Sequence, residues 1–424
     1  MPAVFLFNVV LSRLLGATGV GVFQLTVAIV LVASTVSCLG IGTRLLRDVA
    51  RATETDVAAS VASVYWESIA IVTISAVVVT GSMLAGESVL SGWGYVTPAF
   101  DSVFPVAVVA VVPVALLFVN CRFLAGVGLT TGSVFFEKAA LPLAGLCFVP
   151  LLVRAGDPRS GAVAYVLAAS IAALGTFAVV NYSCGGRAVR HVRRSLWEWT
   201  HDSWSRVVSS SYFFSNELLL IVLGNVDLLI LGLLASQADV GIFNAILRLT
   251  IGATWVRLPI YTRIAPRIVA LAQRGKTAEL EALSTKGART VMLGSAPFLG
   301  FLLIAPHLSL ALFGKEFSAG ANALVIVVLG KVVEVIAGPT RELLLMTGHE
   351  REVTLAVAGA LGLQVLLGIL LVPRFGLIGA AATNVAATVA LALVSTYYVH
   401  RRLSVAPSCI GGGWWGARAS ASNA

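Results

Sequence analysis

Six ionisable residues lie inside long apolar stretches in the second half of the sequence. They are Glu217, Asp227, Arg248, Arg257, Lys331 and Glu334. A charge at membrane depth costs at least about 2.5–3.5 kcal/mol, so such residues normally face a wet cavity or a charged partner. The three bases could bind a phosphate, and the three acids could couple its movement to an ion. Alternatively, the six groups neutralise one another and only hold helices together.

The spacing of four of these residues predicts two pairs. The apolar stretches at 208–234 and 239–264 are expected to form a hairpin that turns near Gln237. Asp227 then lies ten residues before the turn and Arg248 eleven after it. Glu217 and Arg257 are each twenty residues from the same turn. Both pairs are therefore expected at matching depth, with the second pair nearer the cytoplasmic side.

The other two residues are expected to pair within one helix. Lys331 and Glu334 are three residues apart, a spacing that places both on one helix face. The same geometry points Arg248 and Arg257 to opposite sides unless a residue such as Gly252 bends their helix. We therefore expect only one of these two arginines to face a cavity.

The composition indicates what must position these residues. Of 424 residues, 58% are hydrophobic and only 12% are charged, and the mean hydropathy is +0.94. A soluble domain has roughly 45–50% apolar residues. At about 20 residues per crossing, the chain has room for about twelve membrane-spanning helices and no large soluble domain.

Twelve apolar stretches fit this estimate, six in each half. Their approximate bounds are 2–15, 20–40, 58–84, 103–123, 134–153, 161–183, 208–234, 239–264, 288–313, 321–343, 352–373 and 376–399. The first is shorter than a full crossing, which predicts either an upstream start or a helix that covers only the outer part of the bilayer. The predicted division is an N-terminal lobe at 1–183, a basic cytoplasmic interfacial linker at 184–207, a C-terminal lobe at 208–399 and a mobile cytoplasmic tail at 400–424.

The two halves repeat one another. The run VGVF at residues 20–23 returns as VGIF at 240–243, and GAVA at 161–164 returns as GAAA at 379–382. A weaker echo links residues 120–123 with 339–342. Duplicated halves in one membrane are typical of transporters.

The basic residues predict the orientation of a multi-pass protein in the cell membrane. With both ends in the cytoplasm, nearly every Lys and Arg outside the spans lies inside; the exceptions are Arg13, Arg154, Arg159, Lys315 and Arg374. This asymmetry follows the positive-inside rule. It accounts for the net charge of +9, so nucleic acid is not expected as a partner.

Two segments are expected to lie on the inner leaflet. The linker at 184–207 carries Trp197, Trp199 and Trp204 among its arginines, and residues 268–287 are similarly amphipathic. Such segments lie in the membrane interface. For the linker, a specific dock for anionic lipid or a partner protein is the alternative to plain anchoring.

Signs of catalysis or metal binding are weak. The five cysteines are scattered and never form CxxC, so neither a metal site nor a disulfide framework is indicated. The only acid-x-Asp pattern is Glu54-Thr55-Asp56, and the longest outer loop, about residues 85–101, is too small for a catalytic domain. We therefore expect neither an enzyme nor a cofactor, although a glycosyltransferase of glycan assembly is a less favoured alternative.

Several segments together resemble one family. They are LLG at 14–16, VGVF at 20–23, DLLILG at 227–232, VGIFNA at 240–245, LFGKEF at 312–317 and VPRFGLIGAA at 372–381. Their order is similar to that of polysaccharide transporters in the multidrug/oligosaccharidyl-lipid/polysaccharide exporter superfamily. The resemblance implies an all-α membrane protein with two six-helix lobes around a central cavity, and alternating access that moves a lipid-linked oligosaccharide to the outer leaflet. Peptidoglycan-precursor flippases of this superfamily usually carry two further helices, which twelve spans do not provide.

These arguments assign roles to the six charged residues. The expected phosphate-binding residues are Arg248, Arg257 and Lys331, and the expected ion-coupling or gating acids are Asp227, Glu217 and Glu334. The resemblance itself carries over only Asp227 and Arg248. Expected partners are the lipid-linked glycan, membrane lipids and glycan-assembly enzymes, with the protein itself a monomer.

Two other functions remain open. In a cation-coupled multidrug exporter on the same scaffold, Asp227 or Glu217 would bind a cation or a cationic drug directly. If the protein is a non-transporting scaffold for glycan assembly, no substitution in the cavity would change its function.

Overall fold

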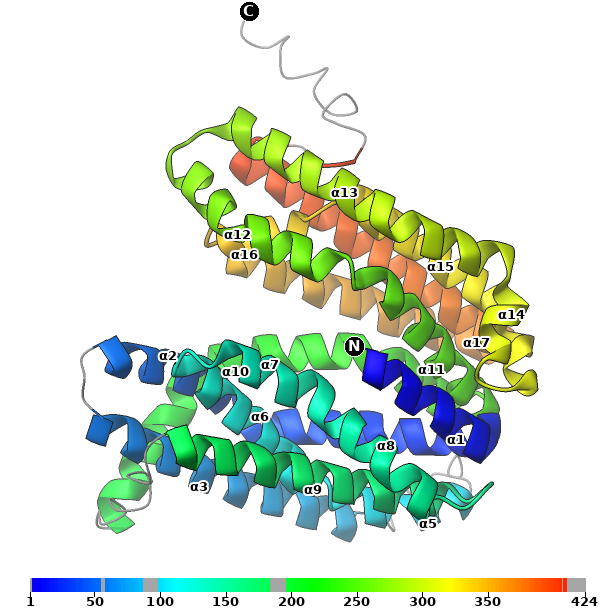
Figure 1. The fold of residues 1–424 in the computed structure, drawn as a ribbon, viewed down its shortest axis with the longest axis horizontal. Coiled ribbons are helices and arrows are strands. Elements are labelled where there is room, and N and C mark those ends of the chain that lie inside the picture. The colour runs from blue at the N-terminus through cyan, green and yellow to red at the C-terminus, as the bar shows by residue number, and fades with distance from the viewer. Residues whose placement is uncertain (1, 55–57, 87–97, 184–195, 406, 410–424) are drawn as a thin grey trace, which may run out of the picture. The chain divides into compact units, whose positions relative to one another are not determined.

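The computed structural model describes the chain except residues 1, 55–57, 87–97, 184–195, 406 and 410–424. The described residues form helices and connecting turns, with no strand among them. The chain divides into two compact units, Met1–Leu233 and Leu234–Ala424. Figure 1 labels their helices.

Unit 1 is built around α6. Its elements are α1 Pro2–Cys38, α2 Ile41–Glu54, α3 Ala58–Ala85, α5 Pro98–Val108, α6 Val111–Gly126, α7 Thr130–Phe135, the π-helical turn η1 Phe136–Ala140, α8 Leu141–Leu152, α9 Pro158–Ser183 and α10 Leu196–Leu234, whose last residue already belongs to unit 2. Helix α6 packs against α1, α2, α3 and α9. Its Val114, Leu117 and Phe123 are buried at these contacts, so apolar burial holds the unit together.

Unit 2 is built around α15. Its elements are α11 Gln237–Ile251, the 3-10 turn η3 Gly252–Thr254, α12 Arg257–Gln273, α13 Thr277–Ile304, α14 Pro306–Ala311, η4 Lys315–Gly320, α15 Ala321–Ala337, α16 Thr340–Met346 and α17 Glu350–Leu403. Helix α15 packs against α11, α13 and α17. The buried Leu324, Val327 and Val328 lie on it.

Helix α1 is a hairpin of two helices that turns at Gly16. The backbone of Gly16 has φ 71°, which a side chain would strain. Asn8 and Gln24 each lie eight residues from this glycine, and the Gln24 amide donates a 2.9 Å hydrogen bond to Asn8 Oδ1. The first arm, residues 2–15, is about 21 Å long at about 1.5 Å per residue, shorter than the apolar thickness of about 30 Å.

Helix α17 is a second hairpin, which turns at Gly376. This glycine has φ 52°, and Arg402 Nη2 in the last turn lies 2.7 Å from Glu352 Oε1 in the first turn. Because the two residues are fifty positions apart, the arms must run antiparallel.

Left-handed glycines confirm that the repeat has a structural meaning. Gly128 (φ 85°) and Gly348 (φ 82°) lie 220 residues apart, and so do Gly156 (φ 78°) and Gly376 (φ 52°). Equivalent turns therefore occur at equivalent places in the two halves.

Helices occupy all twelve predicted positions. Among the described residues, eight helices are long and apolar enough to span a membrane, or nine when α5 and α6, bent by 44°, count as one span. The hairpins α1 and α17 each count once in that number although each holds two helices. The predicted eighth span is divided by η3 at Gly252, so neither α11 nor α12 alone reaches spanning length.

Several predicted boundaries are wrong. The span expected at 288–313 begins at Thr277 and ends at Ile304, because its polar first turns continue the same helix and Pro306 starts a new one. The amphipathic segment expected at 268–287 is likewise two helix ends joined at Gly275 (φ 67°). The span expected at 321–343 ends at Ala337.

Helix α10 packs within unit 1. Arg47 lies over the Phe213 ring at 4.4 Å, and a side chain on Gly40 (φ 70°) would collide with the backbone of Ser210 and Phe214. The unit boundary at Leu233 therefore differs from the expected lobe boundary at residue 208. Residues 184–195 of the expected linker at 184–207 lie outside the described residues, and its remaining residues form the start of α10.

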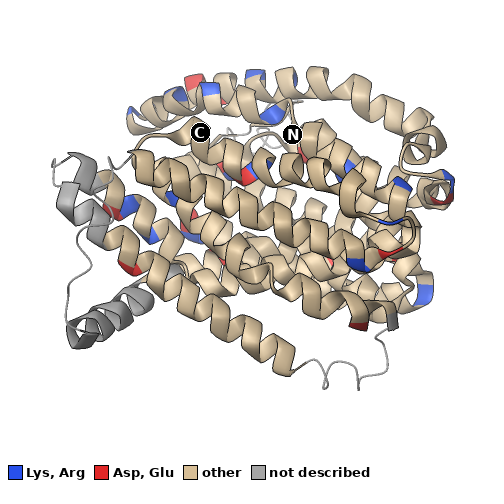
Figure 2. Cartoon of the chain, turned by 60° about the horizontal axis from the view of Figure 1, so that its bottom comes forward, with Lys and Arg blue, Asp and Glu red and all other residues tan. Residues whose placement is uncertain are grey.

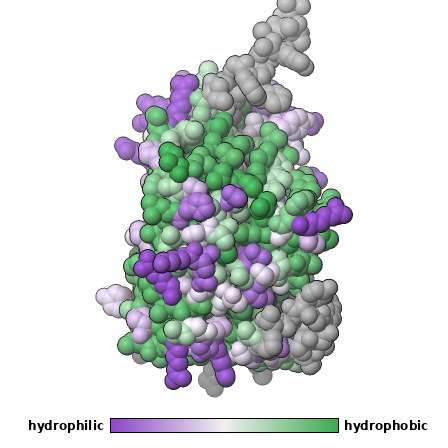
Figure 3. Space-filling view, turned by 90° about the vertical axis from the view of Figure 1, so that its right-hand side faces the viewer, coloured by the Kyte–Doolittle hydropathy of each residue, from purple (hydrophilic) through white to green (hydrophobic). Residues whose placement is uncertain are grey.

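Apolar side chains cover the outside of both units. Leu151, Leu293 and Ile304 are each more than 75% exposed. Figure 2 shows that most of each long helix carries neither acidic nor basic residues, and Figure 3 shows broad hydrophobic areas on one face. Surfaces of this kind suit lipid rather than water, so the chain is a multi-pass membrane protein.

Candidate functional site

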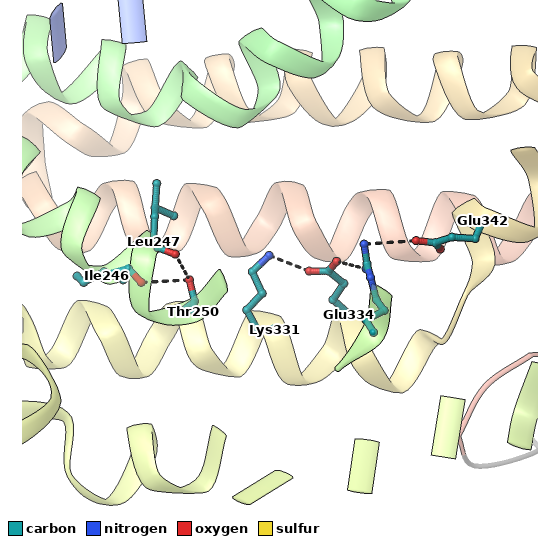
Figure 4. A network of polar contacts seen from close by, with 7 residues as sticks. Ile246, Leu247, Thr250, Lys331, Glu334 and Glu342 are labelled. Atoms are coloured by element: carbon teal, nitrogen blue, oxygen red, sulfur yellow. Dashed lines mark hydrogen bonds and ion pairs between the residues drawn. The ribbon is translucent and has the colours of Figure 1, made fainter. Parts of the chain in front are cut away.

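A network of four charged side chains lies in unit 2. It begins on α15, where Lys331 Nζ lies 2.8 Å from Glu334 Oε2. The pair predicted from the three-residue spacing is thus confirmed. Figure 4 shows the two side chains pointing toward each other along the helix.

Arg257 joins this pair to a second acid. It stands at the start of α12, where Nη1 lies 2.8 Å from Glu334 Oε1 and Nη2 lies 3.3 Å from Glu342 Oε1. Glu342 lies in the first turn of α16, where the helix dipole favours a carboxylate. The network therefore alternates in charge as Lys331, Glu334, Arg257, Glu342 and is neutral in sum.

The partial burial of the network strengthens the interactions between its charges. Its four side chains are only 20–26% exposed, so water screens them incompletely. Removing one partner leaves a poorly solvated charge, which costs about 3–5 kcal/mol when the pair is fully buried and less here. Glu334 is shared by two cations, so a shift of this one carboxylate would free Lys331 and leave Arg257 in contact with Glu342 alone, and both cations could then receive an anionic group.

Two breaks between helices position the residues of the network. The 3-10 turn at Gly252 ends α11, and α12 begins at Arg257, so Arg248 and Arg257 lie on separate helices. A side chain at Gly252 would meet the Phe298 ring at 2.8 Å. Gly338 (φ 77°) separates α15 from α16 and so separates Glu334 from Glu342.

A strap after α17, residues 404–409 without residue 406, packs on the second break. The Cys409 amide donates to the Ile336 carbonyl (3.1 Å), and Arg289 Nε donates to the Cys409 carbonyl (3.0 Å). A side chain at Gly338 would lie 2.1 Å from the Pro407 carbonyl. Burial raises the pKa of the Cys409 thiol, which keeps it protonated.

The described start of the expected mobile tail is therefore ordered. Residues 400–403 continue α17, and Val405 is fully buried. The prediction of a mobile tail from residue 400 is wrong for this stretch because apolar burial and backbone hydrogen bonds anchor it. Residues 410–424 lie outside the described residues.

The other predicted site residues belong to helices other than those that carry the network. Asp227 is buried in α10 of unit 1, and Arg248 lies in the last turn of α11 in unit 2. Glu217 accepts a hydrogen bond from the Thr43 hydroxyl and lies 3.9 Å from Arg122 Nη2, within unit 1. The pairs Asp227 with Arg248 and Glu217 with Arg257 join different units and stay predictions.

Sequence reasoning missed Glu342 as a functional candidate. It stands at the end of the predicted tenth span, where an acid is easily taken for a residue of the membrane surface. The signal that could have found it is the Gly338-Pro339 pair, which predicts a helix break and a new helix with an acid in its first turn. Its partner Arg257 is far away in sequence, so no local spacing connects them.

Unit 1 holds an uncharged polar cluster in which Asn120 of α6 joins α3 to α9. The Tyr65 hydroxyl donates a 2.8 Å hydrogen bond to Asn120 Oδ1, and the Asn120 amide lies 3.3 Å from Thr176 Oγ1. All three residues are buried. In the part of the chain that the structure describes, no group of three His, Cys, Asp or Glu side chains could hold a metal ion.

Comparisons with known proteins point to one class of membrane protein. Residues 1–272 match the family described as polysaccharide biosynthesis protein. The probable low-salt glycan biosynthesis flippase Agl15 of Haloferax volcanii is 24% identical over 218 residues, which are 50% of this chain and 43% of that protein. The matched part therefore spans less than half of this curated relative.

Solved structures show the same fold. An inward-facing MATE family multidrug resistance transporter of the MOP superfamily aligns with a TM-score of 0.76 and 14% identity over 95% of both chains. The lipid II flippase MurJ in an inward closed conformation aligns with a TM-score of 0.74 and 10% identity, covering 94% of this chain and 85% of that one. At these identities, the likeness concerns the fold alone.

Proposed function

Because the chain belongs to the polysaccharide biosynthesis protein family, we propose that it flips a lipid-linked oligosaccharide from the inner to the outer leaflet by alternating access. The observation that carries the proposal is the family match over more than half of the chain. The likeness to a glycan biosynthesis flippase and to the fold of a lipid II flippase supports it. The protein acts in this proposal as a transporter without a catalytic step.

The chemistry of the substrate requires a wet passage. Each sugar hydroxyl left unpaired in hydrocarbon costs several kcal/mol, roughly 4–8 by transfer to cyclohexane, so the glycan must travel through a polar path while the lipid tail stays in the bilayer. A doubly charged pyrophosphate that crosses outward gains about 4–5 kcal/mol per 100 mV of inside-negative potential, at about 2.3 kcal/mol per charge. The membrane potential therefore supplies part of the drive.

The network in unit 2 has the charges that a phosphate needs. In our proposal, Arg257 and Lys331 receive the phosphate when Glu334 moves off them, and Glu342 keeps Arg257 in place during the exchange. Both cations already contact Glu334 at 2.8 Å, so the carboxylate occupies the position that an anionic ligand would take. Arg248 provides a further cation, and Asp227 or Glu217 serves as the coupling acid.

A reconstituted flipping assay tests this function. Purified protein in liposomes is given a fluorescent lipid-linked oligosaccharide, and its exposure on the outer leaflet is measured with and without an imposed potential. We expect protein-dependent flipping that is faster with the potential, and that slows in Arg248→Ala, Arg257→Ala or Lys331→Ala. Unchanged flipping in all three variants, with normal incorporation, would overturn the roles of these residues.

A cation-coupled multidrug exporter is the second candidate, because a multidrug resistance transporter shares the fold at a TM-score of 0.76. Such an exporter would extrude a cationic dye when a proton or sodium gradient is applied. It would lose activity in Asp227→Asn and keep it in Arg248→Ala and Arg257→Ala. A flippase would instead lose activity in Arg248→Ala and Arg257→Ala, and it would extrude no dye.

The proposed setting follows from the charge distribution. We propose that both ends of the chain face the cytoplasm, that the protein works as a monomer and that glycan-assembly enzymes on the inner leaflet supply its substrate. The basic residues of the α12–α13 turn support this orientation under the positive-inside rule. We expect an impermeant maleimide to label a cysteine introduced at the exposed Gly275 only after the cells are opened.

A further inference from the structure

The α12–α13 hairpin presents cations that have no acidic partner. In the described part of the chain, no carboxylate pairs with the exposed side chains of Arg263, Arg267, Arg274, Lys286 and Arg289. The cations of the charged network, by contrast, are all held by acids. The hairpin therefore carries an uncompensated positive charge that the proposed flipping does not use.

Two of these cations line a groove along α13. The groove has a volume of about 640 Å³ and is lined by Ala278, Glu281, Ala282, Thr285, Lys286, Arg289, Thr290 and Leu293. This volume lies within the range of about 300–1,000 Å³ that is typical of small-molecule sites. Lys286 and Arg289 are three residues apart, so they face the groove together. Among the described residues that line the groove, Glu281 at one end is the only acid.

The strap holds one of these cations in position. Arg289 Nε donates to the Cys409 carbonyl at 3.0 Å, which fixes the plane of the guanidinium while both Nη groups remain for a ligand. A planar guanidinium with two such groups suits the oxygens of a phosphate.

The groove lies where α13 enters the apolar region. The helix carries charged and polar residues as far as Thr290 and no charged residue from Val291 to Ile304. Leu293, at the apolar end of the groove, is 76% exposed. A ligand here would thus meet two cations first and an aliphatic surface about one turn deeper.

We propose that this groove binds an anionic phospholipid of the leaflet next to the α12–α13 turn. Its phosphate lies between Lys286 and Arg289, and an acyl chain runs along Leu293. A free phosphate would use the cations only and would leave the aliphatic end of the groove uncovered. The site goes beyond the proposed flipping and does not depend on it.

Lipid binding by the purified full-length protein tests the site. Phosphatidylglycerol is titrated into phosphatidylcholine nanodiscs that hold the protein, and retained lipid is counted by native mass spectrometry. Each basic residue near an anionic membrane contributes about 1 kcal/mol, so Lys286→Gln/Arg289→Gln should weaken phosphatidylglycerol binding about 30-fold. The matched variant Arg263→Gln/Arg267→Gln removes the same charge from the same hairpin outside the groove and should change binding less than threefold.

Three results would overturn the proposal. They are equal binding by the groove variant and the wild type, an equal loss in the two double variants, and displacement of the lipid by soluble glycerol phosphate at the same concentration. The last result would mean that the groove takes free phosphate. Far-ultraviolet circular dichroism confirms that the exposed substitutions leave the helices intact, and the assay needs no transport, so its outcome is separate from that of the flipping assay.

Discussion

The central helices of the two units, α6 and α15 with α16, occupy equivalent positions in a duplicated chain but carry different chemistry. Helix α6 contributes Asn120 to a buried, uncharged cluster with Tyr65 of α3 and Thr176 of α9. Helices α15 and α16 hold the acids of the charged network, and a glycine break at Gly338 separates them. The one charged side chain of α6 is Arg122, which lies 3.9 Å from Glu217, whereas α15 and α16 carry three members of a four-residue network and are separated by Gly338. We infer that substrate binding is concentrated in unit 2.

The largest expected effect concerns the break at Gly338, which has no counterpart within α6. Gly338→Ala should prevent the strap from docking, because its Cβ would lie 2.1 Å from the Pro407 carbonyl in a backbone conformation with φ 77°. Gly348→Ala is the control, since that glycine also has φ 82° but nothing lies within 4 Å of its Cβ. The left-handed backbone alone costs about 1–2 kcal/mol, so Gly348→Ala should lose that much and Gly338→Ala clearly more. Thermal unfolding in detergent measures both, and equal losses would contradict the contact.

A smaller effect is expected from the shared acid of the charged network. Glu334→Gln removes the carboxylate that holds both Arg257 and Lys331. We expect a loss of about 1–3 kcal/mol, below the value for a fully buried pair because the groups are about one quarter exposed. With the cations released, the KM for the lipid-linked substrate should fall together with kcat. A fall in kcat with unchanged KM would argue against competition between Glu334 and the phosphate.

The smallest effect is expected in unit 1. Tyr65→Phe removes one buried hydrogen bond to Asn120 and leaves the ring contacts with Trp66 and Phe123. The expected loss is about 1 kcal/mol of stability, with no change in flipping. If Tyr65→Phe slowed flipping as much as Glu334→Gln, the two units would not differ in function.

Local patterns predicted the helices and one part of the site. Apolar stretches predicted where helices lie, though not where each begins and ends, and a three-residue spacing predicted the pair of Lys331 and Glu334, because both follow from helix geometry within one segment. The contact between Arg257 and Glu342 depends on how α12 and α16 pack, and that packing leaves no spacing in the sequence. The same holds for the bond from Arg289 to the strap.

Boundaries were wrong where polar turns continue a helix or where a glycine breaks one. The first case is α13, which starts at Thr277 well before the apolar run. The second is the end of α15, where Gly338 stops the helix inside an otherwise apolar stretch. Hydropathy records burial in lipid, whereas helix ends depend on backbone conformation, so the two need not coincide.

The most direct test of the concentration of binding in unit 2 is a flipping assay on two matched double variants. Arg257→Ala/Lys331→Ala removes the cations of the charged network, and Asn120→Ala/Thr176→Ala removes the polar cluster of unit 1. With equal incorporation into liposomes, we predict at least a tenfold loss of flipping in the first variant and less than a twofold change in the second, since about 1.4 kcal/mol of lost phosphate binding already corresponds to tenfold. Equal rates in the two variants would contradict the account.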